Sequence, residues 1–325
     1  MRAAVYDRFG PAAAVLRTTE LDRPEPGPGE VRVRVRLSAV NPTDYKARMD
    51  GPGKEMAFPF VVPHQDGAGE VDAVGPGVDP GRVGDRVWMW FAAFQRQLGT
   101  AAEWICLPSE RAVALPEGAS LDLGACLGVP AVTAQVALFS DGPLDGRTVL
   151  VAGGAGAVGH YAIQLARRGG ARVLTTVSSP EKERLASEAG AHGVVDYRQP
   201  GAAEALRGMA PGGVDRVIEL ALGTNMETDL SLLVNGGTVV TYASDEADPA
   251  VPVRRLMMLN ARLRFMILYN VAVPALLHAV TAVSEAVADG TLTELPTVRF
   301  PLEQVVAAHE AVEGHAVGKV LLDLG

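Results

Sequence analysis

The chain has only two cysteines, Cys106 and Cys126, among its 325 residues. No Cys-x-x-Cys pair occurs, so the closely spaced thiolates that hold a structural zinc ion are lacking. We expect both side chains to be free, buried thiols of a cytoplasmic protein.

Aromatic residues make up only 5% of the chain, and its formal net charge is −9. A nucleic-acid-binding protein would show a basic stripe or a stacking surface of aromatic rings, so we expect no nucleic-acid partner. No apolar run approaches the roughly 20 residues needed to cross a bilayer, and the first residues lack the apolar core of a signal peptide. We therefore expect no membrane partner and a cytoplasmic location.

Hydrophobic residues, by contrast, are plentiful at 48%, which is enough for a full core and, at this length, for two domains. Residues 31–40 alternate between apolar and polar side chains, as in a strand with one solvated face. Short strand-like runs separated by glycine and proline continue to residue 116. This spacing predicts a small β-barrel or sandwich over about the first 120 residues.

Six apolar, β-rich runs follow between residues 148 and 267, and helix-like stretches separate most of them. Continuous apolar strands that alternate with helices are typical of a parallel sheet covered on both faces. We therefore predict an α/β fold with a doubly wound Rossmann domain at 123–267. Residues 268–325 are predicted to return and complete the first domain, 1–122.

A glycine-rich loop connects the first of these runs to a predicted helix. Gly154, Gly156 and Gly159 form a Gly-x-Gly-x-x-Gly sequence in the context that dinucleotide binding requires. We expect Gly154 to let the chain turn, Gly156 to let the backbone approach a pyrophosphate, and Gly159 to let the helix pack closely. The predicted phosphate-binding loop consists of Gly154, Ala155, Gly156, Ala157, Val158 and Gly159.

The second predicted strand ends in Ser178, where an NAD site usually has an acidic residue that binds the ribose 2′-hydroxyl. Ser178, Ser179 and Lys182 would instead attract a 2′-phosphate, so we predict NADPH as the cofactor. The same residues also suit the start of a helix, since serine before Pro-Glu is a good N-cap. Both roles are compatible.

Motifs along nearly the whole chain resemble the medium-chain dehydrogenase/reductase superfamily, and most of all its zinc-independent NADPH:quinone oxidoreductase (zeta-crystallin-like) family. They are GACLGVPAVTAQVALF at 124–139, the glycine loop with its helix, TTVSSPEK at 175–182, NPTDYKAR at 41–48, GAGEVDAVG at 67–75, GTAAEW at 99–104 and AVGKVLLD at 316–323. The resemblance implies a GroES-like catalytic domain, a Rossmann domain, a cofactor cleft between them and a homodimer, often joined through the last Rossmann strand. It also implies cofactor contacts from Asn41, Thr133, Tyr197, Tyr242, Ala243, Ser244, Gly318 and Lys319.

The positions that hold zinc in metal-dependent relatives carry no suitable ligands here. The first cysteine of those relatives falls at Asn41, their His-Glu pair at Gln65 and Asp66, and their third cysteine at Val129. His64 and Cys126 lie nearby but off these positions. We therefore expect no metal, and we interpret His64 as a structural residue more readily than as an acid catalyst.

Without a Lewis acid, the chemistry favours acceptors that already take hydride readily, namely quinones and carbonyl-conjugated double bonds. The acceptor oxygen then needs a hydrogen-bond donor, for which Tyr45 and Asn41 are the candidates. Asp44 is interpreted as a helix cap. An aromatic segment at 88–100 predicts a substrate pocket of Trp90, Phe91, Phe94 and Arg96, although ordinary barrel core explains the rings equally well.

Three functions remain open on the sequence. The leading hypothesis is an NADPH-dependent quinone reductase, and an NADPH-dependent enone or enoyl reductase is the alternative within the same class. A non-catalytic NADPH-binding sensor or structural protein is the alternative from another class. The acceptor's identity is not encoded in any motif that we can interpret.

Overall fold

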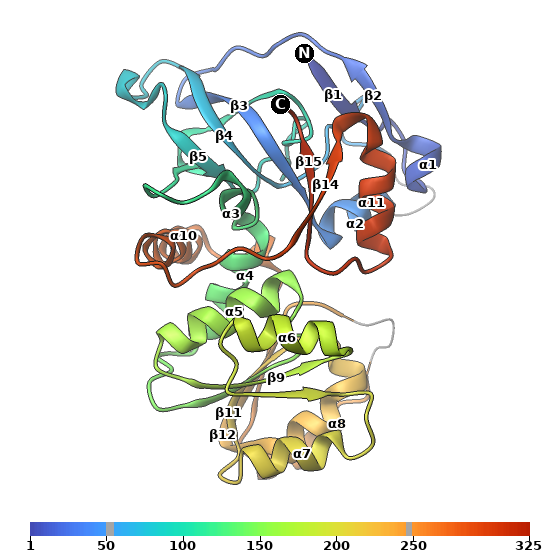
Figure 1. Cartoon of the computed structure of the whole chain (residues 1–325), viewed down its shortest axis with the longest axis vertical. Coiled ribbons are helices and arrows are strands. Elements are labelled where there is room, and N and C mark those ends of the chain that lie inside the picture. Colours follow the sequence, from blue (N-terminus) through green and yellow to red (C-terminus); the bar gives the residue numbers. More distant parts are fainter. Residues whose placement is uncertain (50–54, 245–248) are drawn as a thin grey trace. The chain divides into compact units, whose positions relative to one another are not determined.

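A computed structural model describes residues 1–49, 55–244 and 249–325 of the chain (Figure 1). The chain forms two compact units, Met1–Val129 with Glu294–Gly325, and Pro130–Thr293. The predicted second boundary lay at 267, where the last Rossmann strand ends. In the structure it falls after Thr293, because Thr293 is hydrogen-bonded to His160 and Gln164 within the second unit.

The first unit is built on a seven-stranded sheet in the order β14-β15-β3-β4-β5-β7, with β6 paired to β3, beside a two-stranded sheet of β1 and β2. All pairs are antiparallel except β14 with β15. The strands are β1 (Arg2–Val5), β2 (Arg17–Glu20), β3 (Glu30–Val40), β4 (Asp66–Val74), β5 (Arg86–Met89), β6 (Trp104–Pro108), β7 (Ala112–Ala114), β14 (Thr297–Pro301) and β15 (Lys319–Asp323).

The long alternating strand β3 organises this unit, since it pairs with β4, β6 and β15. Its apolar residues face the core, whereas Arg32 is buried against Glu25 and Asp72 rather than solvated as the alternation suggests. The helices are α1 (Ala12–Val15), α2 (Pro42–Met49), α3 (Leu121–Ala125) and α11 (Val305–Glu313). β15, from the C-terminal segment, pairs with β3 and so lies in the sheet of the first unit.

The second unit contains a six-stranded, entirely parallel sheet in the order β10-β9-β8-β11-β12-β13. This confirms the doubly wound prediction, and the strand order reverses between β8 and β11. The strands are β8 (Thr148–Val151), β9 (Arg172–Val177), β10 (Gly193–Asp196), β11 (Val214–Glu219), β12 (Leu233–Thr241) and β13 (Arg262–Phe265).

Helices α5 and α6 lie on one side of this sheet, and α7 and α8 lie on the other (Figure 1). The helices are α4 (Gly128–Phe139), which enters this unit at Pro130, α5 (Ala157–Arg168), α6 (Pro180–Glu188), α7 (Ala202–Met209), α8 (Leu222–Leu232), α9 (Val253–Met258) and α10 (Val273–Ala288). Across the described ranges, no helix combines the length and apolarity needed to cross a membrane.

Candidate active site

The glycine turn after β8 has the geometry of a phosphate-binding loop, with one correction to the role of Gly154. Gly153 is the residue with positive φ, at 68°, so Gly153 and not Gly154 makes the sharp turn. A Cβ on Gly154 would lie 2.1 Å from the Thr175 hydroxyl oxygen. Gly154 is therefore required for close packing against β9.

Gly156 and Gly159 occupy the positions that the sequence predicts for them. Gly159 is the third residue of α5, where a Cβ would lie 2.3 Å from the Gly153 oxygen, so only glycine fits. Gly156 is the exposed N-cap of α5, and a Cβ there would meet only the Gly153 oxygen, at 3.3 Å. The backbone of this loop, with Ala155, Ala157 and Val158, therefore presents the amino end of α5 to a ligand, where free N–H groups favour an anion.

The residues predicted to select NADPH lie together at the end of β9. Lys182 Nζ is 3.1 Å from Ser178 Oγ, and Ser179 caps α6 by accepting from the Lys182 amide at 3.2 Å. Both predicted roles of this segment are thus compatible in one structure. Tyr197 follows β10 at the same edge of the sheet, with a largely exposed side chain.

The segment after β12 and one residue of α4 complete the predicted cofactor contacts in this unit. Tyr242 and Ala243 are half-buried and Ser244 is exposed, while Thr133 is buried in α4. Burial, assisted by the nearby Glu219 carboxyl, raises the pKa of the Tyr242 hydroxyl above its ordinary range. Tyr242 is therefore a neutral hydrogen-bonding group at any physiological pH.

In the first unit, hydrogen bonds to Asp66 join two other positions that the resemblance aligned with the zinc site of metal-dependent relatives, Asn41 and Val129. Asn41 Nδ2 donates to Asp66 Oδ2 at 2.7 Å, and the Val129 amide donates to the Asp66 carboxylate at 2.8 Å. Lys319, which is buried, donates from Nζ to Asn41 Oδ1. The resemblance implied that Asn41 and Lys319 contact the cofactor, but no feature of the sequence predicted a hydrogen bond between them.

This donor set does not suit a zinc ion. Val129 offers no side-chain ligand, and the Asn41 amide is hydrogen-bonded to Asp66 and Lys319. The Lys319 ammonium would also repel a metal cation placed beside it. Across residues 1–49, 55–244 and 249–325, no group of three or more His, Cys, Asp or Glu side chains is arranged to hold a metal ion.

Asp44 lies beside this cluster as the third residue of α2, inside the first turn, and not before the helix as its interpretation as a helix cap required. Its carboxyl accepts from the Asn41 amide at 2.7 Å. Burial, with a smaller contribution from the neighbouring Asp66 carboxylate, raises the pKa of Asp44 to about 8 against the lowering effect of the Asn41 amide. Burial also raises the pKa of Asp66, to about 6, although Lys319 opposes this increase. At neutral pH the cluster therefore holds a protonated Asp44 next to an ionised Asp66.

The predicted substrate-side residues have mixed surroundings. Tyr45 is half-buried in α2, whereas Trp90 and Phe91 are buried. The ring centroids of Trp90 and Phe91 lie 4.9 Å apart, and those of Phe91 and Phe94 lie 5.4 Å apart. Arg96 is paired with Glu30 at 2.9 Å and donates to the Cys106 oxygen, so its guanidinium serves the barrel wall. These contacts agree with the barrel-core alternative for Trp90 and Phe91.

Sequence reasoning missed a buried histidine pair. His64 Nε2 lies 3.0 Å from His309 Nε2, and Ser38 Oγ lies 2.8 Å from His64 Nδ1. Burial lowers the pKa of His309 to about 3 and holds the pKa of His64 well below its usual range. His64 is thus a neutral, hydrogen-bonded core residue, as its structural interpretation required.

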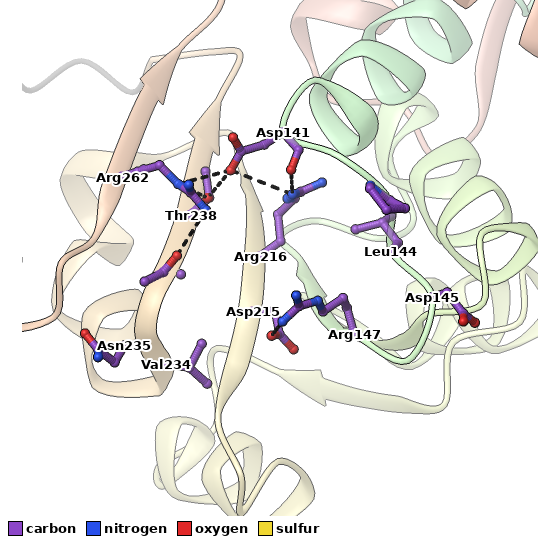
Figure 2. Close-up of a pocket in the computed structure, with 13 residues that line it drawn as sticks. Asp141, Leu144, Asp145, Arg147, Asp215, Arg216, Val234, Asn235, Thr238 and Arg262 are labelled. Carbon is purple, nitrogen blue, oxygen red and sulfur yellow. Dashed lines mark hydrogen bonds and ion pairs between the residues drawn. The ribbon is translucent and has the colours of Figure 1, made fainter.

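A charged cavity of about 260 Å³ opens at the opposite, amino-terminal edge of the Rossmann sheet (Figure 2). Arg262 and Arg216 approach Asp141 Oδ2 at 3.2 and 3.8 Å, and Arg147 pairs with Asp215 at 2.8 Å. Each of these three arginines therefore has an acidic partner. The cavity is separate from the glycine turn, which lies at the carboxyl ends of the strands.

Comparison with known proteins agrees with both halves of this architecture. Residues 27–117 match the family described as alcohol dehydrogenase GroES-like domain, and residues 157–283 match the family described as zinc-binding dehydrogenase. Among solved structures, a NAD-dependent alcohol dehydrogenase is 28% identical, with full coverage of both chains and a TM-score of 0.89. These matches and the fold define a medium-chain dehydrogenase/reductase.

More specific relatives narrow the class. The quinone oxidoreductase of Rattus norvegicus is 30% identical over 98% of this chain and 96% of its own length. A mycobacterial protein solved in complex with NADPH is 29% identical, covers 99% and 100% of the two chains, and has a TM-score of 0.85. The chain belongs to the quinone oxidoreductase family, and the prediction of an oxidoreductase is confirmed.

Proposed function

We propose that this protein transfers hydride from NADPH to a quinone without using zinc. The observation that carries the proposal is the cluster of Asn41, Asp66 and Val129, in which hydrogen bonds and the Lys319 ammonium replace a metal and its ligands. Family membership supplies the oxidoreductase class, and this cluster narrows the chemistry within it.

NADPH is the cofactor that the second unit suits. The exposed amino end of α5 offers backbone N–H groups to the pyrophosphate, and the Ser178 hydroxyl with the Lys182 ammonium suits a 2′-phosphate. Ser178 directly follows β9, at the position where an NAD site has an acidic residue. The carboxylate of such a residue would repel the 2′-phosphate. NADPH, when bound, supplies the hydride. The predicted contacts of Thr133, Tyr197, Tyr242, Ala243, Ser244 and Gly318 belong to this proposal.

The residues at this site do not suit a Lewis-acid metal, so the proposed acceptor is one that takes hydride without such help. A quinone needs no metal to accept hydride, and hydrogen bonds to its oxygen from the Asn41 amide or the Tyr45 hydroxyl stabilise the developing negative charge. Trp90, Phe91 and Phe94 supply flat apolar surface in the same unit, although two of these rings are buried. An enone makes the same demand on its carbonyl oxygen, so the acceptor is the part of the proposal that needs measurement.

A homodimer joined through β13 belongs to the same proposal. β13 is an edge strand, and the side chains on and around it are apolar and exposed: Met257, Met258, Phe265 and Ile267. A second copy of the edge strand would pair its free backbone groups and cover this apolar surface. A cytoplasmic location is also retained, since Cys106 and Cys126 are both free and buried.

The test is turnover of NADPH by the purified protein, followed by loss of nicotinamide absorbance. Benzoquinone, naphthoquinones and phenanthrenequinone are compared with 2-alkenals, enones and an enoyl thioester, before and after treatment with a chelator. We expect fast quinone turnover that the chelator leaves unchanged. Preference for one conjugated carbonyl would replace the quinone by a double bond as acceptor, loss of activity with the chelator would refute zinc independence, and binding without turnover would favour a sensor.

A further inference from the structure

Two buried acids lie at the carboxyl end of β11, on the edge of the sheet that carries the glycine turn. Glu219 is the last residue of β11 and is fully buried, and Asp229 in α8 is 2% exposed. Each acid has one buried oxygen without a hydrogen-bond partner, Glu219 Oε2 and Asp229 Oδ2, and the two carboxyl groups interact, so a proton on one of them would supply the missing donor. A buried pair of this kind cannot readily hold two negative charges.

Glu219 fixes the backbone that leads from β11 into α8. Its Oε1 accepts from the Leu220 amide at 2.7 Å, from the Ala221 amide at 2.5 Å and from Asn225 Nδ2 at 3.0 Å. One oxygen atom therefore satisfies two backbone donors and one side-chain donor. The other oxygen, Oε2, is buried and has no hydrogen-bond partner.

The turn that Glu219 holds is in contact with the glycine turn. A Cβ placed on Gly153 would lie 2.7 Å from Leu220 Cδ2, so the Leu220 side chain lies directly over Gly153. β8 and β11 are adjacent parallel strands, and the strand order reverses between them. Ligands of open α/β sheets bind at such a point, outside the carboxyl ends of the strands. Leu220 and Gly153 thus lie at the place where a dinucleotide is expected.

The groups that act on Asp229 include no positive charge: burial and the Glu219 carboxyl both raise its pKa. Glu219 in turn is contacted by Asn225 from α8 and interacts with the Tyr242 hydroxyl at the end of β12, and both of these groups are uncharged. Burial raises the pKa of Asp229 strongly, and the Glu219 carboxylate raises it further. The proton is therefore retained at neutral pH and lost on the alkaline side.

We propose that Asp229 and Glu219 are positioning residues whose shared proton keeps the Leu220 turn in the arrangement that binds NADPH. This inference rests on the proposed NADPH-dependent function. Loss of the proton places two charges in a buried site, and moving Glu219 toward water relieves the repulsion. Its three donors are then released, and Leu220 is no longer held over Gly153. Affinity for NADPH therefore falls as the pair ionises.

The test is the dissociation constant of NADPH, measured by its fluorescence on binding between about pH 6 and pH 10. Asp229→Asn supplies a permanent N–H donor in place of the shared proton, so its affinity should not follow the ionisation of the pair. We expect the ratio of the wild-type constant to that of Asp229→Asn to rise about tenfold or more over the alkaline range. Any ionisation of the ligand itself affects both proteins alike and cancels in this ratio.

Two further variants keep the test decisive. Glu219→Gln donates its amide N–H to an ionised Asp229 while its oxygen still accepts from the turn, so it should reproduce the Asp229→Asn profile if the latter does not fold. Glu227→Gln removes an exposed acid from the same helix and should follow the wild type. A ratio that stays constant with pH, with NADPH bound normally, would overturn the positioning role alone. Failure of the wild type to bind NADPH at any pH would overturn the proposed function as well.

Discussion

Replacing Asp44 by asparagine should make the protein more stable at neutral and alkaline pH than the wild type. Asp44 is buried, and its carboxyl accepts from the Asn41 amide. Asparagine retains one oxygen for that bond and has no charge to bury. The change therefore isolates the free energy of keeping this carboxyl protonated.

The size and sign of the effect follow from the pKa of Asp44, which burial raises from 3.8 to about 8. An acid whose pKa is raised by folding contributes stability that is fully present below its unfolded pKa and is lost as the pH rises through its folded pKa. At roughly 1.36 kcal/mol for each tenfold change in proton affinity, the loss approaches about 6 kcal/mol between pH 4 and pH 8, as an upper limit. About half of it, roughly 3 kcal/mol, falls between pH 5.5 and pH 7.5.

Thermal unfolding monitored by circular dichroism at several pH values measures this directly. The Tm difference between Asp44→Asn and the wild type should grow by about 4 °C from pH 5.5 to pH 7.5, at an unfolding entropy of roughly 2.1 cal/mol/K per residue. Asp22→Asn, which removes an exposed carboxylate from the same unit, serves as the control and should give a nearly constant difference. If the Asp44→Asn difference is also constant with pH, the reasoning from burial is refuted.

Three other substitutions test separate features of the structure. Ser178→Asp should shift the ratio of kcat/KM from NADPH toward NADH by at least about tenfold, because a carboxylate repels the 2′-phosphate, and an unchanged ratio would refute the assignment. Gly159→Ala should destabilise the fold by about 1–3 kcal/mol in urea unfolding, since its Cβ has no room, whereas Gly156→Ala should leave the unfolding midpoint nearly unchanged and weaken NADPH binding. His309→Gln should reduce the fall in unfolding free energy between about pH 6.5 and pH 4. Burial lowers the pKa of His309 to about 3, so the folded chain resists the protonation that the unfolded chain accepts. A fall equal to that of the wild type over this range would contradict this reasoning.

Much of the fold could be predicted because it depends on local patterns. The six apolar runs became six parallel strands, and the alternation at 31–40 became β3. The domain boundary at 267 could not be predicted from the end of β13, because the hydrogen bonds of Thr293 to α5 join residues about 130 positions apart. The burial of Arg32 was hidden for a similar reason, since its acidic partners come from other segments.

The candidate site was predictable where one segment carries the chemistry and not where distant segments combine. The glycine turn and the Ser178–Lys182 contact each lie within a few consecutive residues. The role of Gly154 was misassigned because the Gly153–Gly154 pair offers two candidates for one turn, and only the backbone conformation distinguishes them. His309 and the acid pair of β11 and α8 gave no signal in the sequence, because single buried polar residues there have no motif around them.

The bonds of Asn41 determine what this side chain can offer to a substrate. Lys319 has no acceptor atom, so the Asn41 atom bonded to it is the amide oxygen, and the nitrogen must face Asp66. Asp66 uses one of the two amide hydrogens and leaves the other. The ammonium bound to Oδ1 withdraws charge from the amide and makes that remaining N–H a stronger donor. With Lys319 and Asp66 opposite in charge and Asp44 protonated, the cluster is electrically neutral at pH 7. In the proposed reaction we therefore expect the Asn41 N–H to act on the acceptor oxygen as a fixed dipole, without a neighbouring net charge that would hinder the arrival of hydride.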